Sequence, residues 1–213
     1  MKRKFKKFGG DYIGDLGEYV REYLKENPGE RIYVGCDSEP KSRSATYAIV
    51  VAFYNPQMRK GVHYIVCKDN IPKPIMKGWN KMSREEKKKN MSGAIFNRIW
   101  AEVEMVVEIG EYLEKELVGY YKRMSVEEVV AAGYGAHQTK LVDIDVDINP
   151  DPGWKKHQKI LIEMGVEPGI PPNRSNIVYS AAKSFLEGYG FRTRFKRKSV
   201  FASCAADFVS KRI

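Results

Sequence analysis

The sequence predicts a single α/β domain in which helices cover the faces of a mixed β-sheet. Two observations carry this prediction. Short apolar stretches that end at turn residues come first, and a long amphipathic segment and alternating strand and helix patterns follow them. With 213 residues, of which 43% are apolar, the chain is also long enough to bury a sizeable core. A mixed sheet with helices on its faces accounts for this order of elements.

The first part of the chain is predicted to hold one helix and three strands. A basic arm spans residues 1–10, and apolar residues at helical spacing predict a helix over residues 11–27. Three strands are predicted at residues 31–37, 46–54 and 62–67, and they would pair as an antiparallel meander. We interpret residues 68–91 as a polar, lysine-rich insertion with at most short helices.

The second part alternates helices and strands. Residues 91–117 carry an apolar stripe at three- and four-residue steps, which predicts the longest helix. A second insertion spans residues 118–140, where a capping box at Ser125 predicts a short helix. Further elements are predicted as a strand at 141–149, helices at 155–164, 175–186 and 200–209, and a strand at 191–195. We find no internal repeat or linker, so residues 1–213 are predicted to form one domain.

Aspartates alternate with apolar residues in the strand at 141–149. A period of two places Asp143, Asp145, Asp147 and Asn149 on one face of that strand. Like charges on one face repel, and a hard cation such as Mg²⁺ or Mn²⁺ would neutralise them. The alternative is a half-exposed antiparallel strand whose acidic face is solvated.

Three further carboxylates stand out from their surroundings. Asp37 ends the first predicted strand, where a turn-capping role is the alternative. Glu102 lies in or beside the buried stripe of the long helix, where pairing with a lysine is the alternative. Asp207 lies among small residues of the last helix, where a solvated pair with Lys211 is the alternative. Together with Asp147, these carboxylates could hold two divalent ions that clamp the reacting oxygens of a phosphodiester.

The charge balance favours an acidic partner. The formal net charge is +10, which suits nucleic acid, although many basic proteins bind none. A positive run at residues 192–198 predicts phosphate contacts, and a charged edge strand that resists aggregation is the alternative. The basic arm would be a disordered nucleic-acid tail or a solubilising end.

The cysteines and the hydropathy indicate an intracellular protein. Cys36, Cys67 and Cys204 are too few and too scattered for a disulfide framework or a zinc site. The sequence shows no long apolar run and no signal peptide, so we expect a cytoplasmic protein without a membrane partner.

Several short motifs occur in the order that one known family has. They are Val34–Ser38, Asp145–Asn149, Arg174–Asn176, Gly190–Phe191 and the segment Lys198–Asp207. These motifs resemble those of the YkuK-like family, described as predicted ribonuclease H-related nucleases of the ribonuclease H-like superfamily. The resemblance covers roughly residues 30–212. It implies a five-stranded mixed sheet, with three antiparallel strands followed by two parallel strands, helices on both faces, and insertions.

The resemblance also implies roles for individual residues. The catalytic, metal-binding carboxylates would be Asp37, Glu102, Asp147 and Asp207, with Glu104 as the alternative to Glu102. Asp145 stands where the family has His, and it would be an additional metal ligand. Nucleic-acid contacts are expected from Ser38, Asn149, Arg174, Ser175, Arg194, Lys196 and Lys198. Ser199 departs from the proline that the family has after the lysine.

The sequence therefore predicts a hydrolase: a nuclease that uses two Mg²⁺ or Mn²⁺ ions to cleave an RNA/DNA hybrid, RNA or DNA. The alternative is a catalytically inactive ribonuclease H-like module that binds nucleic acid. An ATP-binding relative with a similar core is disfavoured, because no glycine-rich phosphate loop follows the paired strands.

Overall fold

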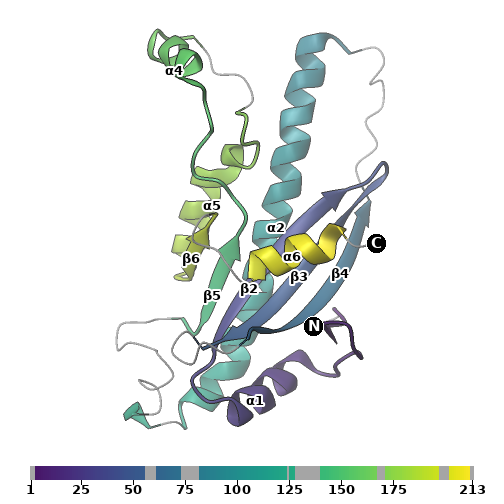
Figure 1. Ribbon diagram of the computed structural model, residues 1–213, viewed down its shortest axis with the longest axis vertical. Coiled ribbons are helices and arrows are strands. Elements are labelled where there is room, and N and C mark those ends of the chain that lie inside the picture. The colour runs from purple at the N-terminus through teal and green to yellow at the C-terminus, as the bar shows by residue number, and fades with distance from the viewer. Residues whose placement is uncertain are drawn as a thin grey trace.

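The computed structural model describes residues 3–55, 61–72, 82–123, 125–127, 140–166, 171–196 and 202–211. Within these residues the strands form one open six-stranded sheet with the order β1-β4-β3-β2-β5-β6 (Figure 1). The strands are β1 (Lys6–Lys7), β2 (Arg31–Pro40), β3 (Ser44–Tyr54), β4 (His63–Pro72), β5 (Val142–Val146) and β6 (Arg192–Phe195). The helices are α1 (Leu16–Glu26), α2 (Arg84–Tyr121), α4 (Lys156–Glu163), α5 (Asn176–Gly188) and α6 (Ala202–Lys211).

The pairing confirms a mixed α/β sheet. Strands β2, β3 and β4 form the predicted antiparallel meander, β5 is parallel to β2, and β6 is parallel to β5. The sixth strand was not predicted. Lys6 and Lys7 pair with β4, and Phe5 beside them is only 1% exposed. The basic arm is therefore not a disordered tail over its described residues, because Phe5 anchors it in the core.

Helices cover both faces of the sheet. On one face, apolar side chains such as Val34, Ile49 and Ile144 pack with residues of α1, α2 and α5 in the main core. On the other face, Tyr33, Val50 and neighbouring residues form a smaller cluster with α6. Figure 1 shows α6 crossing the strands on the face opposite to α2. None of the described helices combines the length and the apolar character needed to cross a membrane.

The close contact between α6 and the sheet depends on a glycine. A Cβ atom on Gly35 would lie only 2.7 Å from the carbonyl carbon of Ala202 and from the amide nitrogen of Ser203. That separation is too short for any side chain. Gly35 therefore lets the backbone of α6 rest directly on β2, close to Asp37.

Several predicted boundaries were wrong. The first helix begins at Leu16 rather than before Tyr12, because Asp15 caps its first turn by accepting a hydrogen bond from Glu18 N at 2.8 Å. Strand β2 continues to Pro40 instead of turning after Asp37, because Ser38, Glu39 and Pro40 all have pairing partners in β3.

In its described residues, 68–72 and 82–91, the first predicted insertion is mostly regular structure. Strand β4 runs to Pro72, and α2 begins at Arg84 behind a capping box formed by Ser83 and Glu86. Helix α2 also extends to Tyr121, into the second predicted insertion. Residues 73–81, 124 and 128–139 lie outside the described part of the chain.

Candidate functional site

Two of the predicted catalytic aspartates lie beside each other where β2 and β5 end their pairing. The last pair in this parallel register joins Cys36 to Val146, so Asp37 and Asp147 follow as the next residues on neighbouring strands. Neighbouring strands are about 4.8 Å apart, and residues at equivalent parallel positions share a face. Burial raises the pKa of Asp37, and the negative charges of Asp207 and Asp147 raise it further. The sheet therefore brings together acids that are far apart in sequence.

Helix α6 contributes the third aspartate and a supporting hydroxyl. The side chain of Ser210 donates a hydrogen bond to Asp37 Oδ2 at 2.6 Å, and it lies 3.0 Å from the backbone carbonyl of Asp207. The Asp207 carboxylate forms an ion pair with Lys211, as one of the sequence alternatives proposed. Ser210 thus holds Asp37 in position, and it was not identified from the sequence, although it lies three residues after Asp207.

Glu102 reaches the same region from α2, on the other face of the sheet. It is 7% exposed and accepts a hydrogen bond from Ser38 Oγ. Arg98 Nη1 lies 2.5 Å from Ser38 Oγ and 3.3 Å from Glu102 Oε1. Burial raises the pKa of Glu102 to about 8, and the charges of Asp37 and Asp147 act in the same direction. Burial therefore favours the protonated form of Glu102.

The structure distinguishes Glu102 from its alternative on the same helix. Glu104 is exposed and accepts a hydrogen bond from Trp100 Nε1 at 2.8 Å. Glu102 instead shares electrostatic interactions with Asp37 and Asp147. Arg98, four residues before Glu102, was missed, although helical spacing alone places it on the same side of α2.

The carboxylates meet only part of what a metal site requires. Carboxylate oxygens are the ligands that Mg²⁺ and Mn²⁺ prefer. Among the described residues, however, no group of three or more His, Cys, Asp or Glu side chains is placed to hold one ion. Glu102 is directed at Ser38 and Arg98, and Asp207 at Lys211. The donor chemistry fits, whereas the orientations shown would have to change for the acids to share an ion.

The acidic face of β5 is matched by a basic face of β6. Asp143 pairs with Arg192, Asp145 with Arg194 at 2.7 Å, and Asp147 with Lys196 at 3.0 Å, a set that we call the charge ladder. Asp143 and Asp145 are fully buried, so the half-exposed antiparallel strand considered from the sequence was wrong. Arg192, Arg194 and Lys196 also alternate along the chain, and this was the signal that could have revealed the ladder.

Asp145 is held inside the ladder. Arg194 donates to both of its oxygens, at 2.7 and 3.0 Å, and Ala202 N donates to Oδ2 at 3.2 Å. These contacts account for the burial of its charge without an ion. A role for Asp145 as a metal ligand stays a prediction.

The residues predicted to contact nucleic acid are not equally placed for that role. Arg174 is exposed, and Lys196 is about half exposed while paired with Asp147. Ser38 is buried against Glu102, and Arg194 is largely covered at Asp145. Ser175 Oγ accepts a hydrogen bond from Asn149 N at 3.0 Å, which joins the start of α5 to the end of the acidic strand. Lys198 and Ser199 lie outside the described residues.

One structural acid was not anticipated. Glu114 of α2 is buried and accepts a hydrogen bond from Val142 N at 2.7 Å. It thereby fixes the first residue of β5 against α2. The signal in the sequence was the position of Glu114 in the helix, one residue after the buried Leu113. An exposed carboxylate fits that position equally well.

No protein-family model, curated protein or solved structure matches this chain. The candidate function therefore depends on the geometry and charges described above.

Proposed function

We propose that the chain is a metal-dependent nuclease of ribonuclease H-like architecture that hydrolyses phosphodiester bonds. The observation that carries this proposal is that Asp37 and Asp147 lie on neighbouring strands, directly after the last residue pair of β2 and β5. The charge of Asp207 raises the pKa of Asp37, and the charge of Asp37 raises the pKa of Glu102. Clusters of carboxylates with raised pKa values are typical of functional sites.

The sheet topology supports the same proposal. Strands β2, β3 and β4 are antiparallel, and β5 and β6 continue the sheet in parallel, as the family resemblance implies. The additional strand β1 lies at the far edge from β5, so it leaves the arrangement around Asp37 unchanged.

Each carboxylate has a distinct place in the proposed site. Asp37 and Asp147 would contribute ligands from the sheet, Asp207 would contribute one from α6, and Glu102 would contribute one from α2. One or two bound divalent ions would activate water and neutralise the phosphate. For these residues to bind an ion, Lys196 and Lys211 would have to release Asp147 and Asp207.

The partner in this proposal is RNA, DNA or their hybrid. The net charge of +10 attracts a phosphate backbone, while Asp37 and Asp147 place two acids next to each other on neighbouring strands. This layout suits a protein that binds a polyanion around a small acidic centre.

A second candidate is a nucleic-acid-binding module without catalysis. It is favoured by the absence, among the described residues, of a group of side chains placed to hold a metal ion. It is also favoured by the ion pairs that already neutralise Asp147 and Asp207. In such a module, Lys196 and Lys211 would neutralise Asp147 and Asp207 in place of a metal ion.

Substitution of Asp37→Asn tests the proposal. We expect cleavage of labelled RNA, DNA and hybrid substrates in Mg²⁺ or Mn²⁺ to fall by more than roughly 100-fold, because a loss at a direct ligand should exceed the effect of losing a supporting contact. The variant should remain folded, because Asn can still accept the hydrogen bond from Ser210. Glu163→Gln, at an exposed position of α4, is the matched control. Equal cleavage by wild type and Asp37→Asn would exclude the mechanism.

A further inference from the structure

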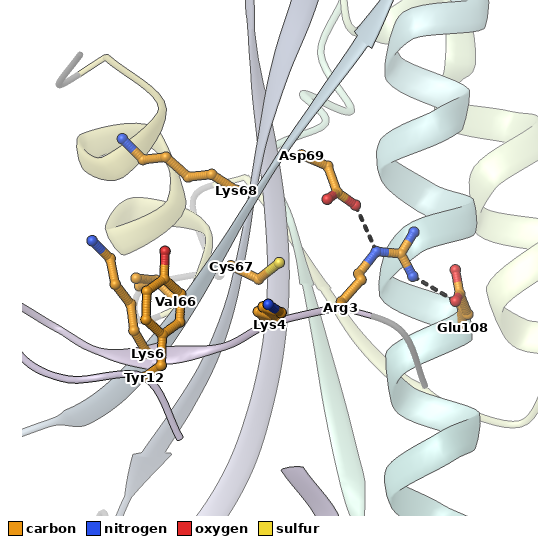
Figure 2. A pocket seen from close by; sticks show the side chains of 9 residues that line it. All are labelled: Arg3, Lys4, Lys6, Tyr12, Val66, Cys67, Lys68, Asp69 and Glu108. Carbon is orange, nitrogen blue, oxygen red and sulfur yellow. Dashed lines mark hydrogen bonds and ion pairs between the residues drawn. The ribbon is translucent and has the colours of Figure 1, made fainter. Parts of the chain in front are cut away.

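A pocket lies at the opposite edge of the sheet from the charge ladder, where the basic arm crosses β4. It has a volume of about 690 Å³, within the usual range for ligand sites. Figure 2 shows its lining, with side chains from the arm, from β4 and from α2. The lining residues are Arg3, Lys4, Lys6, Tyr12, Val66, Cys67, Lys68, Asp69 and Glu108.

The pocket is positively charged. Its two carboxylates, Asp69 and Glu108, both bind the same arginine, Arg3, at 2.7 and 2.5 Å (Figure 2). The other cations of the lining are the lysines at positions 4, 6 and 68. Burial lowers the pKa of Lys68, and the positive charges of Lys6 and Lys41 lower it further. Lysines this close together favour an anion that would relieve their repulsion.

An exposed aromatic ring lies in the same lining. Tyr12 is 70% exposed, although its backbone is fixed by an antiparallel bridge to Lys6. Exposed aromatic side chains beside lysines are the arrangement by which proteins bind single-stranded nucleic acid, because every unpaired base offers a face for stacking. A duplex would keep its bases away from Tyr12.

The pocket is also aligned with the candidate catalytic carboxylate. Lys68 pairs with Ala48 across β4 and β3, and Ala48 pairs with Asp37 across β3 and β2. Side chains at paired positions share a face, so Lys68 and Asp37 lie on the same side of the sheet, two strand spacings or about 10 Å apart. Ala48, which lies between them, is fully buried under α6, so a strand bound at Lys68 would reach Asp37 by passing around that helix.

We propose that this pocket, which we call the β4-edge pocket, binds the backbone of single-stranded RNA or DNA through Lys6 and Lys68 while Tyr12 stacks on a base. The proposal rests on the proposed function in taking nucleic acid as the ligand and Asp37 as the place to which the strand leads. It moves the main phosphate contacts away from the positive run at residues 192–196, whose charges the ladder engages.

The test measures binding without cleavage. The full chain is titrated into labelled single-stranded oligonucleotides, and into the matching duplex, in EDTA at several salt concentrations. We expect the double variant Lys6→Gln/Lys68→Gln to bind at least about tenfold more weakly and to lower the salt slope by about 1.4, because each single-strand phosphate contact contributes about 0.7. Tyr12→Leu should weaken binding about tenfold with the slope unchanged.

Lys159→Gln is the matched control, because Lys159 is exposed on α4 and lies outside the pocket. The proposal is overturned if the double variant matches Lys159→Gln in affinity and slope, if wild type binds no oligonucleotide, or if the duplex binds more tightly than the single strand. Displacement of the oligonucleotide by an equal concentration of inorganic pyrophosphate would equally overturn it, in favour of a small phosphate ligand.

The two proposals fail separately. If wild type binds single strands through Lys6 and Lys68 but Mg²⁺ and Mn²⁺ produce no cleavage, the β4-edge pocket stands and the nuclease does not. If Asp37→Asn abolishes cleavage while the pocket variants bind normally, the nuclease stands and the pocket proposal falls.

Discussion

At the scale of single residues, Glu102 shows how burial and neighbouring charge set a protonation state. Its helical spacing placed it in or beside the buried stripe, and the structure confirms that it is buried. Its neighbours Ser38 and Arg98 could not be predicted, because they depend on β2 continuing past Asp37 and lying against α2. The sequence thus located the acid, whereas its hydrogen-bond partners required the tertiary fold.

The raised pKa of Glu102 predicts a stability that changes with pH. In the unfolded chain this carboxyl ionises near its ordinary pKa of 4.5, whereas in the folded chain it ionises near 8. The protonated form is therefore favoured by folding, and its contribution to stability is complete below pH 4.5 and is lost as the pH rises toward 8. Glu102→Gln removes this loss.

For each pH we compare the free energy of unfolding of Glu102→Gln with that of wild type. We expect the variant's advantage to be larger at pH 8 than at pH 5 by more than about 1 kcal/mol. Urea unfolding without divalent ions, at both pH values, measures the difference. Glu104→Gln is the control, because Glu104 is exposed on the same helix. A difference between Glu102→Gln and wild type that stays constant with pH would contradict the shifted pKa.

At the scale of elements, strands β5 and β6 show what local patterns leave out. Alternation correctly predicted both strands, and their two charged faces were visible separately in the sequence. The pairing of Asp145 with Arg194 was not foreseen, because register between strands 49 residues apart is not encoded in either local pattern. The same arginines were interpreted as phosphate ligands, since a basic run alone fits both roles.

The charge ladder predicts a large cost for removing one cation. Arg194→Met removes the bidentate partner of the fully buried Asp145, and we expect a loss of about 3 kcal/mol in the free energy of unfolding. The double variant Asp145→Asn/Arg194→Met should recover part of this loss, because no buried charge remains at that position. Urea unfolding of both variants provides the measurement.

Lys183→Met is the matched control for Arg194→Met. Lys183 pairs with Glu187 on an exposed face of α5, and such surface pairs contribute at most about 1 kcal/mol. If Arg194→Met costs no more than this control, the ladder does not stabilise the buried aspartates.

At the scale of the whole molecule, the order of elements was enough to predict an α/β domain with a mixed sheet. The strand in the basic arm could not be predicted in this way, because two paired residues and one buried phenylalanine form too short a pattern. The family resemblance led us to expect four converging carboxylates, and the structure places two of them, Asp37 and Asp147, next to each other on neighbouring strands. Ion binding depends on how these side chains are oriented in the assembled site, and no local pattern in the sequence encodes that orientation.

Divalent ions should stabilise the intact chain. An ion that binds the folded state at 100 times its dissociation constant adds about 2.7 kcal/mol, which raises the Tm of a chain of this size by roughly 5 °C or more. We expect this rise for wild type in Mn²⁺ or Mg²⁺ relative to EDTA, and a clearly smaller rise for Asp37→Asn. Thermal unfolding followed by circular dichroism measures it. No rise in either protein would favour the inactive binding module.

The absence of a side chain at Gly35 has a consequence for saturation mutagenesis. Any larger residue would push α6 off β2, and Ser210 and Asp207 would move away from Asp37 with it. A screen that scores activity alone would therefore rank Gly35 with the acids, although it carries no reactive group. Abundance has to be scored in parallel before intolerance at this position is interpreted as chemistry.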